Sequence, residues 1–291
     1  MAVSTDVSKA QSRFQRITKQ LLRNRRAVVG GIILLVIITM AIFAPYAATH
    51  DPVKQNIRNQ LKPPSREHIF GTDQFGRDIF SRVVYGARLS LRVGFLSISF
   101  ALVVGGLLGL VSGYFGGWMD MIIMRLIDIL LALPGFLLAL AIVAALGPGL
   151  ENVVMAIGVS YVPSFARMMR SSVLATRELD YVGAAQALGA SDSRIIFLHI
   201  LPNSISPIIV LTTLSMAGAI LSAAGLSFLG LGAQPPTPEW SSMIATARPF
   251  IRVSHWSVTI PGLAIFITVM CLNLVGDGLR DALDPRLKNL S

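Results

Sequence analysis

Long stretches without charged side chains alternate with short polar segments along this chain. Six of them contain no Asp, Glu, Lys or Arg, at residues 27–50, 93–119, 129–150, 152–166, 195–238 and 253–276. A helix needs roughly 20 apolar residues to cross a hydrocarbon core of about 30 Å, and it satisfies its own backbone polar groups there. The pattern therefore predicts an all-α polytopic membrane protein with six transmembrane helices.

Glycine and proline residues set the expected ends of these helices. After the first helix, we expect others at residues 93–112, 121–146, 152–169, 204–226 and 258–274. Pro134 lacks a backbone donor and should kink the third helix. Pro202 should mark a turn before the fifth helix, and an exposed or re-entrant loop should follow that helix. Arg125 and Asp128 are three residues apart, so we expect them to pair on one helix face.

The polar segments divide the chain into parts on two sides of the membrane. We expect a cytoplasmic tail or interfacial helix at 1–26, a first transmembrane helix at 27–50, an extracytoplasmic loop at 51–92, a five-helix core at 93–280 with a cytoplasmic loop at about 170–203, and a cytoplasmic tail at 281–291. Residues 1–26 carry seven basic side chains against one acidic one, which favours the cytoplasmic side. An even number of helices then places both termini in the cytoplasm.

Two features of this topology stay open. The loop at 51–92 carries eight basic residues against four acidic ones, which fits an extracytoplasmic loop less well, although longer loops follow the charge rule less strictly. In the tail, Phe14, Ile17 and Leu21 recur at helical spacing among basic residues. This spacing suits an amphipathic helix on the inner leaflet, and a partly disordered basic tail is the alternative.

Composition narrows the protein class. Hydrophobic residues make up 53% of the chain and charged residues 14%, with a mean hydropathy of +0.66, whereas soluble domains carry about 25% charged residues. An ordinary soluble domain is therefore excluded. The net charge of +10 comes from basic residues that flank apolar stretches, without the interleaved aromatic side chains that stack on bases. We therefore expect the chain to lie in a lipid bilayer and not to bind nucleic acid.

The sequence carries no motif of catalysis or cofactor binding. Cys271 is the only cysteine, so a disulfide within the chain and a multi-cysteine metal site are excluded. The four histidines lack the spacing of common metal motifs, and we expect no metal site. No lysine follows the glycine-rich lead that cradles phosphate, so the chain is not itself an ATPase. We expect a non-catalytic protein that gains energy, if it uses any, through a partner.

Composition alone leaves receptor, channel, secondary carrier, membrane enzyme and transport-complex subunit open. The expected helices lack the acid or histidine relay of an ion-coupled carrier. The cytoplasmic segment at 180–203 reads DYVGAAQALGASDSRIIFLHILPN. It resembles the EAA loop of ATP-binding-cassette (ABC) importer permeases, in which a short helix of small residues inserts into a groove on the ATPase.

The resemblance implies that this coupling loop transmits closure of the ATPases to the membrane helices. Gly183 stands where the family usually has glutamate. The residues expected to contact the ATPase are Tyr181, Gly183, Ala184, Ala185, Leu188 and Gly189.

Three further segments make the resemblance more specific. They are GTDQFGRD at 71–78 with its continuation to 91, LSFLGLGAQPPTPEW at 226–240, and PGLA at 261–264 with NLVGDGLRDALDP at 273–285. They are similar, in the same order, to the C-type permease of dipeptide, oligopeptide, nickel and glutathione importers. The resemblance covers most of the chain from residue 71 to its end.

The resemblance implies a type I ABC importer permease fold in a bacterial inner membrane. The implied partners are a B-type permease subunit, two ATP-binding subunits and an extracytoplasmic solute-binding protein. ATP and Mg would bind to the ATPase subunits and not to this chain. The alternative from another class is an autonomous channel or secondary carrier, which would be active without ATPases.

Two exposed segments are expected to shape the outer side. Their residues could either order the segments themselves or contact a docking binding protein, and both interpretations stay open. The residues are Thr72, Asp73, Gly76, Arg77, Asp78, Gln234, Glu239 and Trp240. The sequence assigns no residue to the solute, which could be a dipeptide, a longer peptide, glutathione or chelated nickel.

Overall fold

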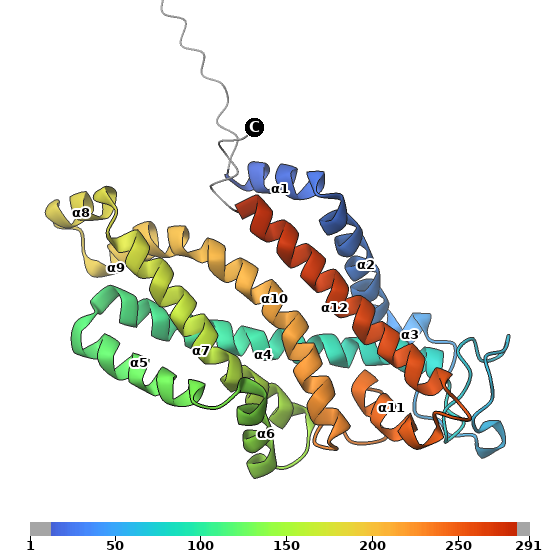
Figure 1. Ribbon diagram of the computed structural model, residues 1–291. Coiled ribbons are helices and arrows are strands. Elements are labelled where there is room, and N and C mark those ends of the chain that lie inside the picture. Colours follow the sequence, from blue (N-terminus) through green and yellow to red (C-terminus); the bar gives the residue numbers. More distant parts are fainter. Residues whose placement is uncertain (1–12, 284–291) are drawn as a thin grey trace, which may run out of the picture.

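The computed structural model describes residues 13–283, and the tail residues 1–12 and 284–291 lie outside the described residues. Within the described range the chain folds into helices joined by loops, with one isolated β-bridge between Thr72 and Asp78. The predicted all-α fold is confirmed. Long helices run between two ends of the molecule, with α8 (Asp180–Ala187) at one end and the loop at 51–78 beside α11 (Trp240–Ala247) at the other (Figure 1).

The N-terminal part forms two helices at a bend. Helix α1 (Arg13–Arg23) is followed by α2 (Arg25–Ile42), and Asn24 between them caps α2 by accepting a hydrogen bond from the Ala27 amide at 3.3 Å. The amphipathic segment of the tail is thus helical. Helix α2 ends well before residue 50, and the short helix α3 (Ala44–Ala47) continues from the break at Phe43.

Helix α4 is longer than the sequence pattern predicted. It runs over 37 residues, Ile79–Phe115, and therefore begins inside the stretch expected to be a loop. Asp78 caps it by accepting a hydrogen bond from the Ser81 amide at 2.8 Å. Arg82, in the first turn of α4, was interpreted as a loop residue, but it is buried within the helix, where the carbonyl oxygens of Pro52 and Pro236 accept its hydrogen bonds.

The expected third helix is broken rather than kinked. Helices α5 (Gly117–Leu131) and α6 (Gly135–Leu146) meet at an angle of 84°. Pro134 lies in the break, and the residue before a proline is disfavoured in helical conformation, so the chain leaves the helix there. Asp128 pairs with Arg167 of α7 (Leu150–Arg177) at 2.7 Å, so the prediction that it pairs with Arg125 was wrong.

Pro202 does not form the predicted turn. Helix α9 (Asp192–Arg194), a π-helical segment (Ile195–Ile200) and α10 (Leu201–Phe228) form one continuous helical run. The π-helical segment immediately precedes Pro202, so the proline, which has no backbone donor, lies where the hydrogen-bond pattern of the run changes, and the helix continues through it. The last long helix, α12 (Trp256–Leu283), extends beyond its predicted end at residue 274.

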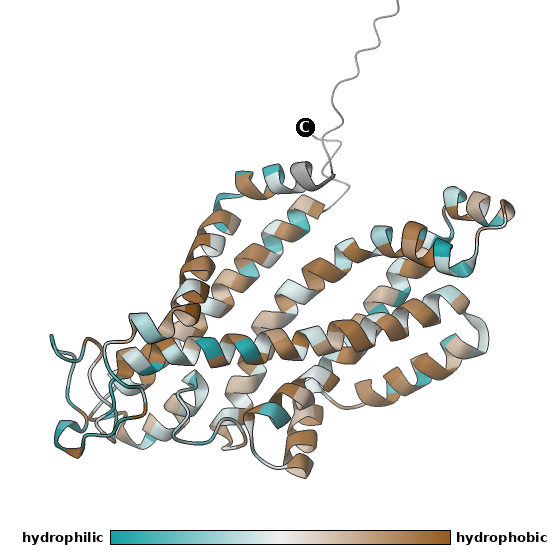
Figure 2. Cartoon of the chain, turned by 180° about the vertical axis from the view of Figure 1, so that it is seen from behind, coloured by the Kyte–Doolittle hydropathy of each residue, from teal (hydrophilic) through white to brown (hydrophobic). Residues whose placement is uncertain are grey.

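Four helical runs in the described residues are long and apolar enough to cross a membrane: α2, α4, the run Asp192–Phe228, and α12. The bent pair α5–α6 is a fifth if it crosses as one unit. The remaining predicted span corresponds to α7 (Leu150–Arg177), which is long enough but carries more charge. Hydrophobic residues make up much of the long helices (Figure 2), and many of their large apolar side chains are exposed, as expected for contact with lipid or membrane partners.

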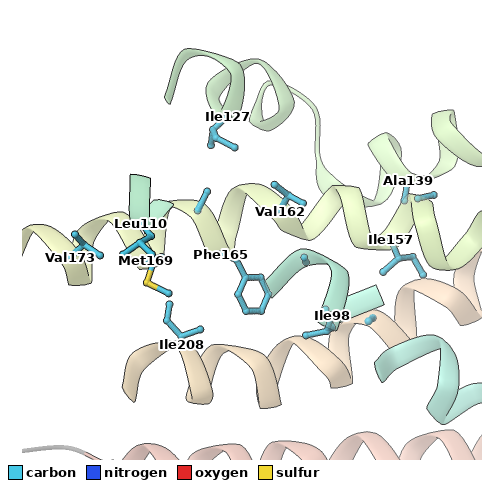
Figure 3. Close-up of a cluster of buried hydrophobic side chains, with 14 of the residues drawn as sticks. Ile98, Leu110, Ile127, Ala139, Ile157, Val162, Phe165, Met169, Val173 and Ile208 are labelled. Carbon is cyan, nitrogen blue, oxygen red and sulfur yellow. The ribbon is translucent and has the colours of Figure 1, made fainter. Parts of the chain in front are cut away.

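The main core lies where α7 packs against α4, α6 and α10. Phe165 of α7 is fully buried, and Figure 3 shows it beside Ile98 of α4 and Ile208 of α10. Glycines on α4 allow very close approach of the two backbones. A Cβ atom on Gly105 would lie 2.5 Å from the Val162 carbonyl oxygen.

The same holds one helical turn later. A Cβ atom on Gly109 would lie 2.2 Å from the Ala166 carbonyl oxygen. The two glycines therefore set the separation of α4 and α7, in the manner of small residues at membrane helix contacts.

Candidate functional site

The loop at 51–78, here called the signature loop, is organised around the Asp73 carboxylate. Its Oδ1 accepts hydrogen bonds from the amides of Phe75 at 2.9 Å and Arg77 at 3.0 Å, and its Oδ2 accepts one from Arg77 Nε at 2.6 Å. Gly76 adopts a φ of +68°, and a Cβ atom there would collide with the Asn56 carbonyl. The turn at 73–77 is thus fixed by one acid, one base and one glycine.

Thr72 joins this turn to the preceding part of the loop. Its hydroxyl donates a hydrogen bond to the Asn59 carbonyl and accepts one from the Lys62 amide at 2.9 Å, while its own amide donates to the Lys62 carbonyl at 3.0 Å. Thr72 is fully buried. The loop therefore has a defined structure, although its regular elements are only a short 3-10 helix (Ile57–Asn59) and the bridge between Thr72 and Asp78.

Arg82, in the first turns of α4, connects three segments. Its Nη1 donates hydrogen bonds to the carbonyl oxygens of Pro52 at 2.7 Å and Pro236 at 3.3 Å. Its Nε lies 3.6 Å from Asp73 Oδ2 and has no hydrogen-bond partner among the described residues. The buried guanidinium thus holds the signature loop against the segment at 230–240.

The segment at 230–240 ends in a buried helix cap. Glu239 accepts hydrogen bonds from the amides of Ser241 at 3.0 Å and Ser242 at 2.8 Å, and from the hydroxyls of Ser90 at 3.2 Å and Ser227 at 3.3 Å. These four donors come from α11, α4 and α10. One carboxylate therefore holds three helices together at this end of the molecule.

Trp240 adds an apolar contact next to this cap. Its ring is 1% exposed, and its Nε1 donates a hydrogen bond to the Val83 carbonyl at 2.8 Å. A Cβ atom on Gly86 would lie 2.6 Å from the Trp240 ring, so the glycine allows the ring to lie against α4. The fold thus brings residues 71–86 and 230–240, which are far apart in sequence, into one assembly.

Seven of the eight residues expected on the outer side are buried in internal contacts: Thr72, Asp73, Gly76, Arg77, Asp78, Glu239 and Trp240. Gln234 alone of the eight is exposed, and its Nε2 donates hydrogen bonds to the carbonyls of Gly230 and Gly232, both at 3.0 Å. These seven residues build the end of the molecule that contains the signature loop, and Gln234 lies at its surface.

The expected coupling residues occupy the opposite end, on α8 and its C-terminal cap. Gly189 ends the helix at a φ of +77°, and bonds from the Gly189 amide to Gln186 O at 2.9 Å and from the Ala190 amide to Ala185 O at 3.1 Å close the turn. Tyr181, Gly183, Ala184, Leu188 and Gly189 are exposed, and Ala185 is half-buried. The structure therefore places all six expected residues on one projecting helix (Figure 1).

Two contacts attach α8 to the helices behind it. Val182 is fully buried among core residues. The Tyr181 hydroxyl accepts a hydrogen bond from Asn203 Nδ2 at 3.0 Å and donates one to the His199 carbonyl at 3.4 Å. The segment at 199–203 lies at the junction of the π-helical segment and α10, so these hydrogen bonds connect α8 to the start of α10.

A second polar group supports the far side of the coupling loop. The Tyr114 hydroxyl at the end of α4 donates to Asp192 Oδ1 at 2.6 Å, and Arg177 Nη1 donates to the Tyr114 carbonyl at 2.8 Å. Arg170 of α7 makes two bonds of 2.6 Å to Asp120 of α5. Sequence reasoning missed these residues, because their partners lie on different helices and have no recognisable spacing.

Two family models match parts of this chain. A family model described as "Binding-protein-dependent transport system inner membrane component" matches residues 105–289, and one described as "N-terminal TM domain of oligopeptide transport permease C" matches residues 12–64. The dipeptide transport system permease protein of Alkalihalophilus pseudofirmus is 52% identical over 280 residues, which cover 96% of this chain and 92% of the relative.

Two further relatives and one solved structure are also similar to this chain. A di/tripeptide transport permease of Pseudomonas aeruginosa is 48% identical over 91% of this chain and 90% of the relative. A glutathione transport permease of Pectobacterium atrosepticum is 45% identical over 93% of this chain and 90% of the relative. The inward-facing MetNI methionine ABC transporter matches with a TM-score of 0.57 at 18% identity, over 70% of this chain and 96% of that chain, and shows the fold.

Proposed function

This chain belongs to the family of binding-protein-dependent transport system inner membrane components, and on that premise we propose that it forms half of the transmembrane path of an ABC importer for small peptides. The relatives named for dipeptides, di/tripeptides and glutathione support a solute of this class, because all three are short chains of amino acids. The chain itself is a transport subunit.

The observation that carries the coupling role is the projecting helix α8. Leu188 is 88% exposed, and a Cβ atom at Gly183 or Gly189 would meet nothing within 4 Å. An apolar tip flanked by glycines suits insertion into a groove, where burial of a leucine stabilises a complex by about 1.5–3 kcal/mol. Val182 and Tyr181 would pass the resulting motion to α7 and α10.

We infer the mechanism from these attachments. ATP binding closes the two ATPase subunits and draws the coupling helices of the paired permeases together. Because α8 is attached to α7 and α10, this motion reorients the long helices as rigid bodies and opens the path outward. Hydrolysis releases the ATPases and returns the path to the inward-facing state.

An ABC importer permease implies an ATPase and a binding protein as partners. We further propose a heterodimer with a B-type permease and two ATPase subunits, with ATP and Mg bound to those subunits only. Both termini and the coupling loop would face the cytoplasm, and the signature loop would face outward. The buried signature residues would give a binding protein a stable surface, on which exposed Gln234 is a candidate contact.

Reconstitution in liposomes tests the proposal against an autonomous channel or carrier. The permease pair with its ATPases, binding protein and hydrolysable ATP should accumulate a labelled dipeptide, and omission of ATP or of the ATPases should stop accumulation. The control replaces ATP with a non-hydrolysable analogue. Dipeptide uptake by this chain alone, without ATP, would show that the proposed function is wrong.

A further inference from the structure

A group of two histidines and one aspartate lies beside the signature loop, outside the coupling site. His50 follows α3, His68 lies within the signature loop, and Asp78 caps α4. One ligand atom from each of these three side chains lies within 4.8 Å of the others. The His50 and His68 rings are 4.7 Å apart between centroids. Three separate chain segments thus bring metal-ligating atoms to one point.

The distances are close to those of a bound transition metal. His68 Nδ1 lies 2.9 Å and His50 Nδ1 lies 3.8 Å from the same carboxylate oxygen, Asp78 Oδ1. Tetrahedral zinc with bonds of about 2.0–2.2 Å separates its ligand atoms by about 3.4 Å. Small movements of two side chains would therefore place all three atoms around one ion.

The surroundings of the three ligands favour a cation. A cavity of about 290 Å³ opens next to them. Its lining includes the carboxylates of Asp51, Glu67 and Asp78 and one ammonium group, that of Lys54. Three negative charges against one positive charge attract a divalent ion, and the cavity leaves room for water or a further ligand at the open coordination position.

The ligands are also held in place by neighbouring groups. Asp78 Oδ2 accepts hydrogen bonds from the amide of Ser81 at 2.8 Å and from its hydroxyl at 2.7 Å, which leaves Oδ1 facing the histidines. The same Ser81 hydroxyl accepts a hydrogen bond from the His50 amide at 2.9 Å. Outer partners of this kind orient metal ligands.

We propose that His50, His68 and Asp78 bind one divalent transition-metal ion, of which Zn²⁺ is the best match. Two imidazoles and one carboxylate with an open fourth position are a donor set that zinc accepts. The ion replaces the His68–Asp78 hydrogen bond and the hydrogen bond of 3.0 Å between the Thr49 hydroxyl and His50 Nδ1. It joins the end of α3, the signature loop and the start of α4, and so makes the outer end more rigid.

Zinc binding by the full-length chain in its assembled transporter tests this proposal. The complex is purified with a tag that contains no histidine, dialysed against Zn²⁺ and analysed for metal per complex. The wild type should hold one zinc ion more per complex than the His50→Gln variant. The zinc affinity of the variant should be more than tenfold lower, because even the loss of a residue that only supports a metal ligand lowers metal affinity about 10–100-fold. Zinc should also raise the thermal unfolding temperature of the wild type and not that of His50→Gln.

Two further variants make the result specific. Asp78→Asn keeps an oxygen that can cap α4 and should also lose the zinc. His255→Gln changes an exposed histidine beside Trp256, which contacts the signature loop at Thr72, and should keep it. Cobalt should give visible absorption bands in the wild type and in His255→Gln. Equal zinc in the wild type and His50→Gln, or an equal loss in His255→Gln, would overturn the proposal.

Discussion

The two ends of this molecule hold their polar side chains in opposite ways. In the signature loop, Asp73, Arg77 and Arg82 are buried and contact one another. At the coupling loop, α8 projects with most of its side chains exposed and is attached mainly through Val182 and Tyr181. The first arrangement keeps a fixed shape, whereas the second offers a surface to a partner. Mutations at the first end should affect stability and mutations at the second should affect coupling.

The largest effect is expected for Asp73→Ala. The change leaves Arg77 and Arg82 buried without their carboxylate, and breaking a buried ion pair in this way costs about 3–5 kcal/mol of the free energy of unfolding. Thermal unfolding of the purified complex in detergent measures it. Asp180→Ala, in the exposed first turn of α8, is the control and should lose only about 0.3–1 kcal/mol. If both variants lost the same free energy of unfolding, the signature loop would not depend on its buried charges more than α8 does on its exposed ones.

An intermediate effect is expected for Leu188→Glu, and it should appear in coupling only. Leu188 is 88% exposed, so the free energy of unfolding should change little. ATPase affinity should fall about 10- to 150-fold, which corresponds to losing about 1.5–3 kcal/mol of leucine burial. Co-purification of the ATPases and dipeptide transport measure the loss.

The matched control for Leu188→Glu is Ser191→Glu, an exposed site three residues further along the coupling loop. It introduces the same charge, and we expect transport to stay within about twofold of the wild type, since surface changes usually stay within about 0.5 kcal/mol. Full transport by a well-expressed Leu188→Glu protein would contradict the docking of α8.

The smallest effect is expected for Tyr181→Phe. It removes the hydroxyl that joins α8 to Asn203 and His199, and a single hydrogen bond of this kind contributes about 0.5–1.5 kcal/mol. ATP hydrolysis should continue while the number of dipeptides moved per ATP decreases. Tyr46→Phe, at a highly exposed site near the other end, is the control. If Tyr181→Phe moves as many dipeptides per ATP as the wild type, the Tyr181 hydrogen bonds do not couple α8 to α10.

The sequence was sufficient for the helical fold and the family, because apolar periodicity and short motifs are local. It was insufficient where a charge has a distant partner. Arg82 was assigned to a loop, yet it lies in a helix because Pro52 and Pro236 accept its hydrogen bonds. Asp128 was paired with its near neighbour on the same helix, whereas α7 supplies Arg167.

The same reason explains the outer residues and the histidines. The sequence left open whether Asp73 and Glu239 order their own segments or contact a binding protein, and the structure shows that each accepts hydrogen bonds from buried amides or hydroxyls. His50 and His68 share no metal-motif spacing, because the three segments that bring them to Asp78 are joined by an irregular loop. Local patterns do not encode such long-range convergence.

The glycines between α4 and α7 have a mechanical consequence. Because Gly105 and Gly109 leave no room for even one methyl group, α7 cannot slide along α4 without driving larger side chains into its carbonyl oxygens. The two helices should therefore move together, and the longer one, α4, is about 55 Å long at a rise of 1.5 Å per residue. A displacement at the contact of Tyr114 with Asp192 would be carried along α4 toward the turn that Asp78 begins, over a length that exceeds the roughly 30 Å of a hydrocarbon core.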